Sequence, residues 1–276
     1  MGAAAIETQE EMPELILPYI TYEQFGAAGG GVTDERRLGT AAMKLGLTSV
    51  TFRKLEWREI IRIARDCRLD GIEWGGDVHV PPGDTELAGE IYRATVAAGL
   101  AVLSYGSYYR LGGGDPFESV LDTACALRAN TIRVWAGTKL NLAIPDARRA
   151  ADMANAHDIT IALEYHRNTL TETSEGAAAL LKAVDRENVK TYWQPNPELT
   201  HAQNLAELAA VSPYLEYIHV FCWTRHGRRL PLDAGAGEWR AYLHTARPKA
   251  AILEFVKSDS AAQCVKDAQA LRRICE

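Results

Sequence analysis

The feature that most constrains this chain is an eightfold alternation of short apolar runs with helical patterns, starting at residue 44. Eight runs are predicted as strands, at residues 44–50, 70–74, 100–105, 130–135, 159–164, 189–193, 215–220 and 250–255. Eight helices are predicted to follow them, at residues 56–68, 84–98, 116–128, 146–157, 174–185, 202–210, 238–245 and 259–273. Such alternation is typical of repeated βα units that build a parallel sheet.

The number of strand–helix pairs selects one parallel architecture. Eight pairs match the (β/α)8 TIM barrel, which uses about 250 residues as a single unit. A doubly wound nucleotide-binding sheet would carry GxGxxG after its first strand, but that turn reads TFRKLEW. We therefore predict one α/β domain, a single (β/α)8 barrel over residues 44–276.

Residues 1–43 lie outside the repeating pattern. They are rich in Ala, Gly and Glu, contain seven acidic against two basic residues, and show no sustained period of 3.6 or 2. We predict a flexible, acidic N-terminal extension. Because Met43 directly precedes the first strand, one hypothesis is that the natural chain begins there.

The composition excludes several classes of protein. A net charge of −6 has the wrong sign for a protein that binds phosphate backbones, so no nucleic-acid partner is expected. No apolar stretch reaches the roughly 18 residues of a membrane span, so no membrane partner is expected either. Five cysteines without CxxC spacing suggest reduced thiols and a cytoplasmic location. Exposed barrel helices often pair, which leaves a homo-oligomer open.

Four consecutive predicted strands place polar side chains at their carboxyl ends, where TIM barrels build their active sites. These residues are Glu164, Gln194, His219 and Glu254. A single strand-end glutamate is more often solvated, and a lone strand histidine more often belongs to the core. Together, two carboxylates, an imidazole and an amide oxygen form a mixed oxygen and nitrogen ligand set for one divalent metal ion. Mn²⁺ fits best, and Mg²⁺, Co²⁺ and Zn²⁺ are also compatible.

Other polar and aromatic residues near the same strand ends are candidates for substrate binding. Arg133 and Trp135 alternate on the fourth strand with the same facing, which suits clamping of hydroxyl oxygens and stacking on a sugar. His166 follows Glu164 by two residues, and His79 follows the second strand. Glu73 is expected either to orient other site groups through hydrogen bonds or to pair with Arg53 or Arg133. An aromatic wall is also expected, from Tyr105, Tyr108, Tyr109, Trp193 and Trp223.

Several segments resemble the xylose isomerase-like barrels, a family of sugar isomerases and epimerases, inosose dehydratases and endonuclease IV. The segments are GIEW with DVHVPPG, IRVWAG, LEYH, YIHVFCW and LEF. In the family's ketose epimerases, Glu, Asp, His and Glu from strands 5 to 8 bind the metal, and both glutamates exchange protons with substrate. The resemblance implies these roles for Glu164, His219 and Glu254.

The resemblance also implies that Arg225 binds substrate, and the sequence differs from the family pattern at two positions. Arg225 matches a family arginine that contacts substrate oxygens. Gln194 stands where the family usually has Asp, and Pro197 stands where a histidine is common. The amide of Gln194 brings no charge, so metal binding should be weaker or the metal a stronger Lewis acid.

These observations predict a divalent-metal-dependent isomerase or epimerase of a sugar, keto-sugar or inositol derivative. Proton transfer by Glu164 and Glu254 would pass through a metal-stabilised enediolate. A lyase or dehydratase acting on a keto-inositol or 3-keto-glycoside is the alternative, with His79 or His166 as the additional acid. Acidic charge and Pro197 oppose an endonuclease IV-like repair enzyme. A barrel that only binds a sugar remains the non-enzymatic interpretation.

Overall fold

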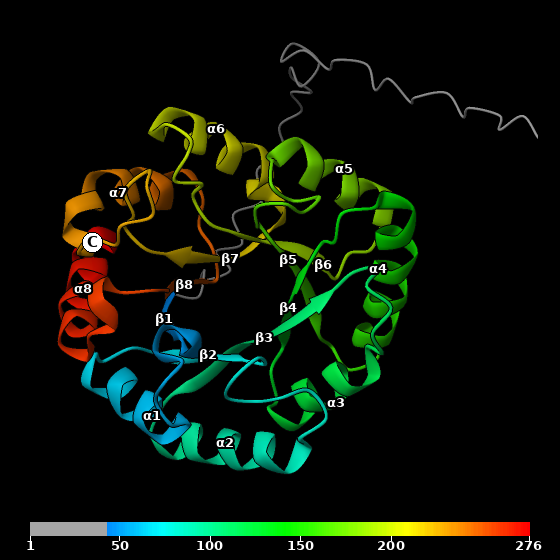
Figure 1. Cartoon of the computed structure of the whole chain (residues 1–276), viewed down its shortest axis with the longest axis horizontal. Helices are drawn as coiled ribbons and strands as arrows, with labels where there is room; N and C mark the ends of the chain where they lie inside the picture. The colour runs from blue at the N-terminus through cyan, green and yellow to red at the C-terminus, as the bar shows by residue number, and fades with distance from the viewer. Residues whose placement is uncertain (1–42) are drawn as a thin grey trace, which may run out of the picture. The chain divides into compact units, whose positions relative to one another are not determined.

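The computed structural model describes residues 43–276, which form a closed barrel of eight parallel strands surrounded by eight helices (Figure 1). Each strand pairs with its sequence neighbours, and β8 closes the ring against β1. The strands are β1 (Lys44–Thr48), β2 (Gly71–Gly75), β3 (Ala101–Arg110), β4 (Thr131–Trp135), β5 (Thr160–Glu164), β6 (Val189–Trp193), β7 (Leu215–Val220) and β8 (Ala250–Leu253). The predicted (β/α)8 fold is confirmed. The predicted extension, apart from Met43, lies outside the described residues.

The helices cover the outside of the barrel, one after each strand. They are α1 (Trp57–Asp66), α2 (Thr85–Ala97), α3 (Glu118–Ala126), α4 (Leu140–Asn155), α5 (Ser174–Val184), α6 (His201–Val211), α7 (Ala236–Thr245) and α8 (Ala261–Cys275). Short 3-10 turns are η2 (Ser49–Phe52), η3 (Ser212–Tyr214), η4 (Leu232–Gly235) and η5 (Lys257–Asp259). Within the range that the structure describes, no helix is long and apolar enough to cross a bilayer.

Local sequence explains where several helices begin. Glu56 and Glu59 form a capping box at α1, and Thr200 and Gln203 form one at α6. The side chain of Asp84 accepts a hydrogen bond from the Leu87 N–H at the start of α2. Each contact satisfies a backbone donor that the first helical turn leaves free. These caps fix the loops that run from the carboxyl ends of the strands into the helices.

The core has two parts. The larger apolar cluster lies between the strands and the helices, and includes Ile72, Val134 and Leu163. A second cluster lies inside the barrel and comprises Leu103, Ala162, Tyr192, Tyr217, Ala250 and Ile252. The apolar interior residues give way to buried polar side chains toward the carboxyl ends of the strands. This polar layer holds the candidate site.

Two predicted boundaries were wrong for identifiable reasons. β3 runs to Arg110 instead of residue 105, because its pairing with β4 continues across a register shift between Gly106 and Arg110. α4 begins at Leu140 instead of residue 146, with Pro145 inside the helix. Proline is most common in the first turn. At its sixth position Pro145 withholds one helical hydrogen bond, which α4 tolerates.

Candidate metal and substrate site

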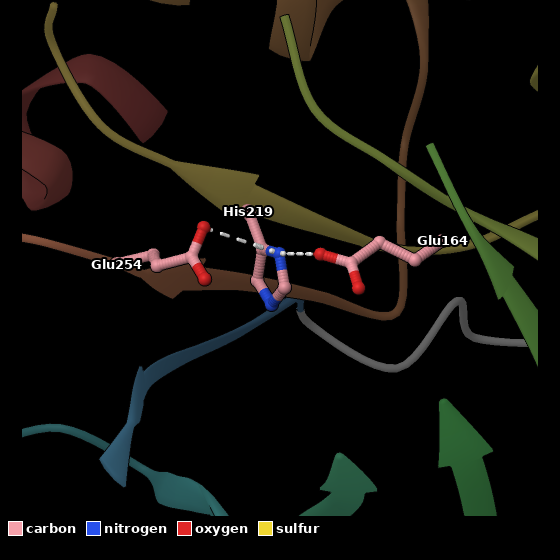
Figure 2. Close-up of side chains that lie close together, drawn as sticks. All are labelled: Glu164, His219 and Glu254. Atoms are coloured by element: carbon pink, nitrogen blue, oxygen red, sulfur yellow. Dashed lines mark ion pairs between the residues drawn. The ribbon is translucent and has the colours of Figure 1, made fainter. Parts of the chain in front are cut away.

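Three buried side chains converge at the carboxyl end of the barrel. Glu164 is the last residue of β5, His219 lies in β7, and Glu254 directly follows β8. The Glu254 N–H donates to the Val220 carbonyl at 2.9 Å, which seats Glu254 beside the end of β7. One potential ligand atom from each of the three residues lies within 4.8 Å of the other two. Figure 2 shows the two carboxylates on opposite sides of the imidazole.

Both nitrogens of the His219 imidazole lie near buried carboxylates. Nδ1 lies 3.6 Å from Oε1 of Glu164 and 3.5 Å from Oε2 of Glu254 (Figure 2). Nε2 lies 3.2 Å from Oε1 of Glu73 on β2. Nδ1 is buried and has no hydrogen-bond partner among residues 43–276. If Nε2 carries the hydrogen and donates it to Glu73, the Nδ1 lone pair faces the two carboxylates, as a metal ligand requires.

The charges in this layer are unbalanced. Glu73, Glu164 and Glu254 are buried with the single guanidinium of Arg133, which bonds both Glu73 and Glu164. With His219 neutral, the ionised group carries a net charge of −2. Burying uncompensated charge is costly, and one divalent cation would neutralise it. Two carboxylates and one imidazole nitrogen therefore fit such an ion in both donor type and charge.

The same imbalance shifts the pKa values of the buried groups. Burial, reinforced by repulsion from Glu164, raises the pKa of Glu254 to about 7. Burial opposes a charged His219, but the carboxylates of Glu254 and Glu73 outweigh it and raise the pKa of His219. Burial also opposes a charged Glu73, but Arg133 and His219 hold the pKa of Glu73 far below its ordinary range. Without a metal ion, protons on Glu254 and His219 would supply the missing positive charge.

Glu164 is held by three donors, whereas among residues 43–276 the carboxylate of Glu254 has only the nearby imidazole of His219 as a polar side-chain partner. Arg133 and the Trp135 indole N–H both donate to Oε2 of Glu164. The Gln194 amide nitrogen lies 3.4 Å from Oε1 of Glu164 and 2.5 Å from the Tyr165 carbonyl oxygen. Gln194 therefore reaches the predicted site, but with its donor nitrogen toward Glu164. These hydrogen bonds hold the carboxylate of Glu164 in place, whereas the carboxylate of Glu254 is less restrained.

A pocket of about 280 Å³ opens over these carboxylates. This volume is near the lower end of the range of about 300–1,000 Å³ for ligand pockets, which suits a small ligand. Of the predicted substrate residues, Arg133, Trp135 and His166 line it. The Trp135 and His166 rings stack at 4.4 Å. These three residues lie where a substrate above Glu164 would contact them.

His79 and Arg225 are not among the described residues that line this pocket. His79 is buried, with Nδ1 3.0 Å from the Ser49 hydroxyl and Nε2 3.1 Å from the Leu55 carbonyl. Burial lowers the pKa of His79, which favours its neutral form. Arg225 is exposed in the loop after β7. Their predicted substrate roles stay predictions.

Several lining residues have no role in the sequence-based prediction, among them Arg53, Phe221 and Phe255. Arg53 follows β1, forms an ion pair with Asp77, and donates to the Tyr108 hydroxyl at 2.6 Å. Phe221 and Phe255 line the pocket near β7 and β8. Arg53 could have been found by asking which residues follow the strand ends. Phe255 could not have been found in this way. In a regular strand, the residue after an inward-facing Glu254 would point away from the barrel interior.

The expected aromatic wall is partly in the pocket. Tyr108 and Trp223 line it, whereas Tyr105, Tyr109 and Trp193 are buried in the main apolar cluster. Tyr108 packs edge-on against Trp135 with ring centroids 5.4 Å apart. The pocket therefore has aromatic rings on more than one side.

Comparisons with known proteins agree on the fold. The probable 3-DHS dehydratase AsbF of Bacillus anthracis has a TM-score of 0.69 at 18% identity, covering 83% of this chain and 99% of its own. D-psicose 3-epimerase of Clostridium cellulolyticum H10 has a TM-score of 0.65 at 16% identity, covering 85% and 100%. A xylose isomerase-like TIM barrel protein of Mycobacterium smegmatis, solved in complex with magnesium, has a TM-score of 0.63 at 17% identity, covering 85% and 97%.

Sequence comparison gives the family. No curated protein matches this chain. Residues 61–274 match the family model of the xylose isomerase-like TIM barrel. The match covers most of the chain, including β5, β7 and β8 with Glu164, His219 and Glu254. The chain therefore belongs to the xylose isomerase-like TIM barrel family.

Proposed function

We propose that this protein is a divalent-metal-dependent isomerase or epimerase of a sugar, keto-sugar or inositol derivative. The observation that carries the proposal is the unpartnered Nδ1 of His219, buried between the carboxylates of Glu164 and Glu254. Glu164, His219 and Glu254 would hold the ion, and Gln194 would join them only by turning its amide oxygen toward it. Mn²⁺ is the first candidate, since the donor set is rich in oxygen.

A bound divalent ion would polarise a substrate carbonyl and stabilise the negative charge that develops when a neighbouring carbon loses its proton. The protein's own residues would move that proton. Glu254, the less restrained of the two carboxylates, would take up and release that proton. Arg133 and Trp135 would keep Glu164 oriented through their hydrogen bonds to its Oε2 atom.

A lyase or dehydratase is the second candidate, and one observation favours it. Epimerisation through two opposed bases needs both carboxylates free to exchange protons. Glu164 accepts from Arg133, Trp135 and Gln194, whereas Glu254 is the less restrained of the pair. One mobile carboxylate would remove the proton from carbon, and the leaving hydroxyl or glycosyl oxygen would take up a proton from an additional acid, for which His166 lines the pocket. The structural neighbours include both epimerases and a dehydratase.

Incubation of the Mn²⁺-loaded protein with keto-sugars and keto-inositols in heavy water tests both candidates. We expect deuterium to enter the substrate carbon next to the carbonyl, with an isomeric product for an isomerase or loss of water or an alcohol for a lyase. Glu254→Gln should abolish exchange. Glu216→Gln is the matched control, since Glu216 is equally buried in β7 but bonds Lys249 instead of the site. Exchange that persists in Glu254→Gln would contradict the proposal.

A further inference from the structure

The pocket is divided by polarity. Its polar lining comes largely from residues at the ends of β1, β4 and β5, including Arg53, Arg133 and Glu164. Residues that follow β6, β7 and β8 supply the polar side chains of Gln194, Asn196 and Glu254. They also supply a set of apolar residues, here called the apolar wall, which consists of Pro195, Pro197, Phe221, Trp223 and Phe255. A ligand that fills the pocket must satisfy both environments.

Two polar side chains on this side each have one group already engaged. The Gln194 nitrogen donates to the Tyr165 carbonyl, and the Asn196 side-chain oxygen accepts from the Glu198 N–H at 3.0 Å. The Trp223 indole N–H is buried, without a partner among the described residues, so Trp223 presents ring carbon to the pocket. A hydroxyl placed against this wall would find few groups to bond, at a free-energy cost.

Phe255 lines the pocket only because its backbone leaves the strand geometry. Consecutive strand residues face opposite sides, yet Glu254 and Phe255 both line the pocket. Phe255 has φ of 55°, a left-handed conformation that is unfavourable for a bulky residue. Its N–H donates to the buried Thr51 hydroxyl at 3.2 Å, which holds the turn. Strained residues of this kind gather at ligand-binding sites.

An arginine packs against two of the rings in the apolar wall. The Arg229 guanidinium carbon lies 4.8 Å from the Phe255 ring centroid and 5.8 Å from that of Trp223. Arg229 is itself held by an ion pair with Asp259. The rings of Phe255 and Trp223 are 5.7 Å apart and tilted by 45°. Two aromatic rings that contact Arg229 therefore line the same cavity as the carboxylates of Glu164 and Glu254.

We propose that the substrate is a carbohydrate carrying an aromatic ring, whose ring packs against Trp223 and Phe255 while its hydroxyl-bearing part lies over Glu164 and Glu254. The inference rests on the proposed function, which places the reacting carbons at those carboxylates. It narrows the substrate class to aryl-substituted sugars such as aryl glycosides. An unsubstituted sugar would leave the apolar wall facing water or unpaired hydroxyls.

Calorimetric binding of matched glycosides tests this inference without turnover. The probes are the methyl and phenyl β-glycosides of glucose, galactose and xylose, titrated into the Mn²⁺-loaded and the metal-free full chain. We expect the phenyl member of at least one pair to bind about tenfold more tightly, as stacking on two aromatic rings allows. Trp223→Ala and Phe255→Gly should reduce that ratio to about threefold or less.

Phe255→Gly and one control variant separate ligand contact from folding. Phe255→Gly removes the ring and relieves the positive φ, so its melting temperature should be unchanged or higher while the phenyl preference falls. Tyr214→Ala is the matched control, because Tyr214 is an exposed aromatic residue that does not line the pocket. It should keep the full preference.

Equal affinity for phenyl and methyl members in all three pairs would overturn the inference. A phenyl preference that survives in both wall variants would overturn it too, since the ring would then bind elsewhere. Failure of the proposed reaction is a separate result. It would show as missing deuterium exchange with every keto-sugar, whereas glycoside binding does not depend on exchange.

Discussion

Glu73 links the barrel interior to the histidine that faces the two glutamates. Its carboxylate accepts from Ser104 Oγ at 2.8 Å, from Arg133 Nε at 3.2 Å, and lies 3.2 Å from His219 Nε2. It touches no pocket surface and is fully buried. We therefore propose that Glu73 is a positioning residue, which fixes the orientation of His219 and, when Nε2 carries the hydrogen, its tautomer.

Replacing Glu73 by Gln should weaken metal binding. The variant leaves Arg133 with one carboxylate and presents an amide to His219 Nε2. We expect Mn²⁺ affinity to fall about 10–100-fold, and the free energy of unfolding to fall by about 3–5 kcal/mol. Titration calorimetry and denaturant unfolding measure the two effects. Ser104→Ala, which removes one donor to Glu73, should cost only about 1 kcal/mol, and unchanged affinity in Glu73→Gln would refute the positioning role.

The raised pKa values of Glu254 and His219 predict how the metal-free protein responds to pH. Glu254 has a pKa of about 7 in the folded protein, against 4.5 ordinarily. Its contribution to folding stability is therefore complete below pH 4.5 and is lost as pH rises through 7. The raised pKa of His219 acts in the same direction above 6.5. Stability that depends on Glu254 should therefore decline between about pH 5 and pH 8.

The lowered pKa of His79 makes stability rise with pH, which opposes the effect of Glu254. Because both proteins contain His79, the measurement compares wild type with Glu254→Gln. Their difference in melting temperature, recorded in chelator, should change in favour of the variant as pH rises from 5.5 to 8. Mn²⁺ should stabilise wild type more at pH 8, because binding displaces protons. A difference that is constant or reversed across this range would contradict the assigned protonation of the site.

At the scale of elements, the approach of β3 to β4 positions the guanidinium that holds Glu164. A Cβ atom on Gly106 would lie 2.5 Å from the Arg133 Nη2 atom and 3.3 Å from Glu73 Oε1. The register shift of β3 begins at this residue. Any side chain here would displace Arg133 from between the two carboxylates.

Gly106→Ala should therefore destabilise the protein by about 1–3 kcal/mol and weaken Mn²⁺ binding. Thermal unfolding and calorimetry measure both. Gly237→Ala in α7 is the matched control, since nothing lies within 4 Å of a Cβ atom there, and its effect should stay within about 0.5 kcal/mol. Wild-type stability and affinity in Gly106→Ala would mean that the position of Arg133 is not critical.

The strands and helices of this fold are readable from the sequence because their signal is periodic. Alternating βα units set the barrel, and its geometry puts Glu164, His219 and Glu254 at one end. Boundaries such as the start of α4 are less readable, since tertiary packing lets Pro145 lie inside a helix. The conformation of Phe255 and the inward turn of His79 depend on loop contacts to Thr51 and Ser49. Such contacts leave no periodic signal.

At the scale of the whole molecule, closure of the barrel brings together residues that are far apart in sequence. Glu164 and Glu254 come from β5 and the end of β8, and His219 of β7 lies between them (Figure 2). Arg133 and Glu73 reach the same layer from β4 and β2. Five strands therefore contribute to one buried charge cluster, which one divalent cation would bring to neutrality.

Titration of chelator-treated protein with Mn²⁺, followed by calorimetry, tests that central claim most directly. We expect one ion to bind per chain, with a rise in melting temperature, and we expect both effects to be lost in His219→Ala and Glu254→Gln. Absence of stoichiometric binding by folded wild-type protein, or undiminished binding by both variants, would contradict the account.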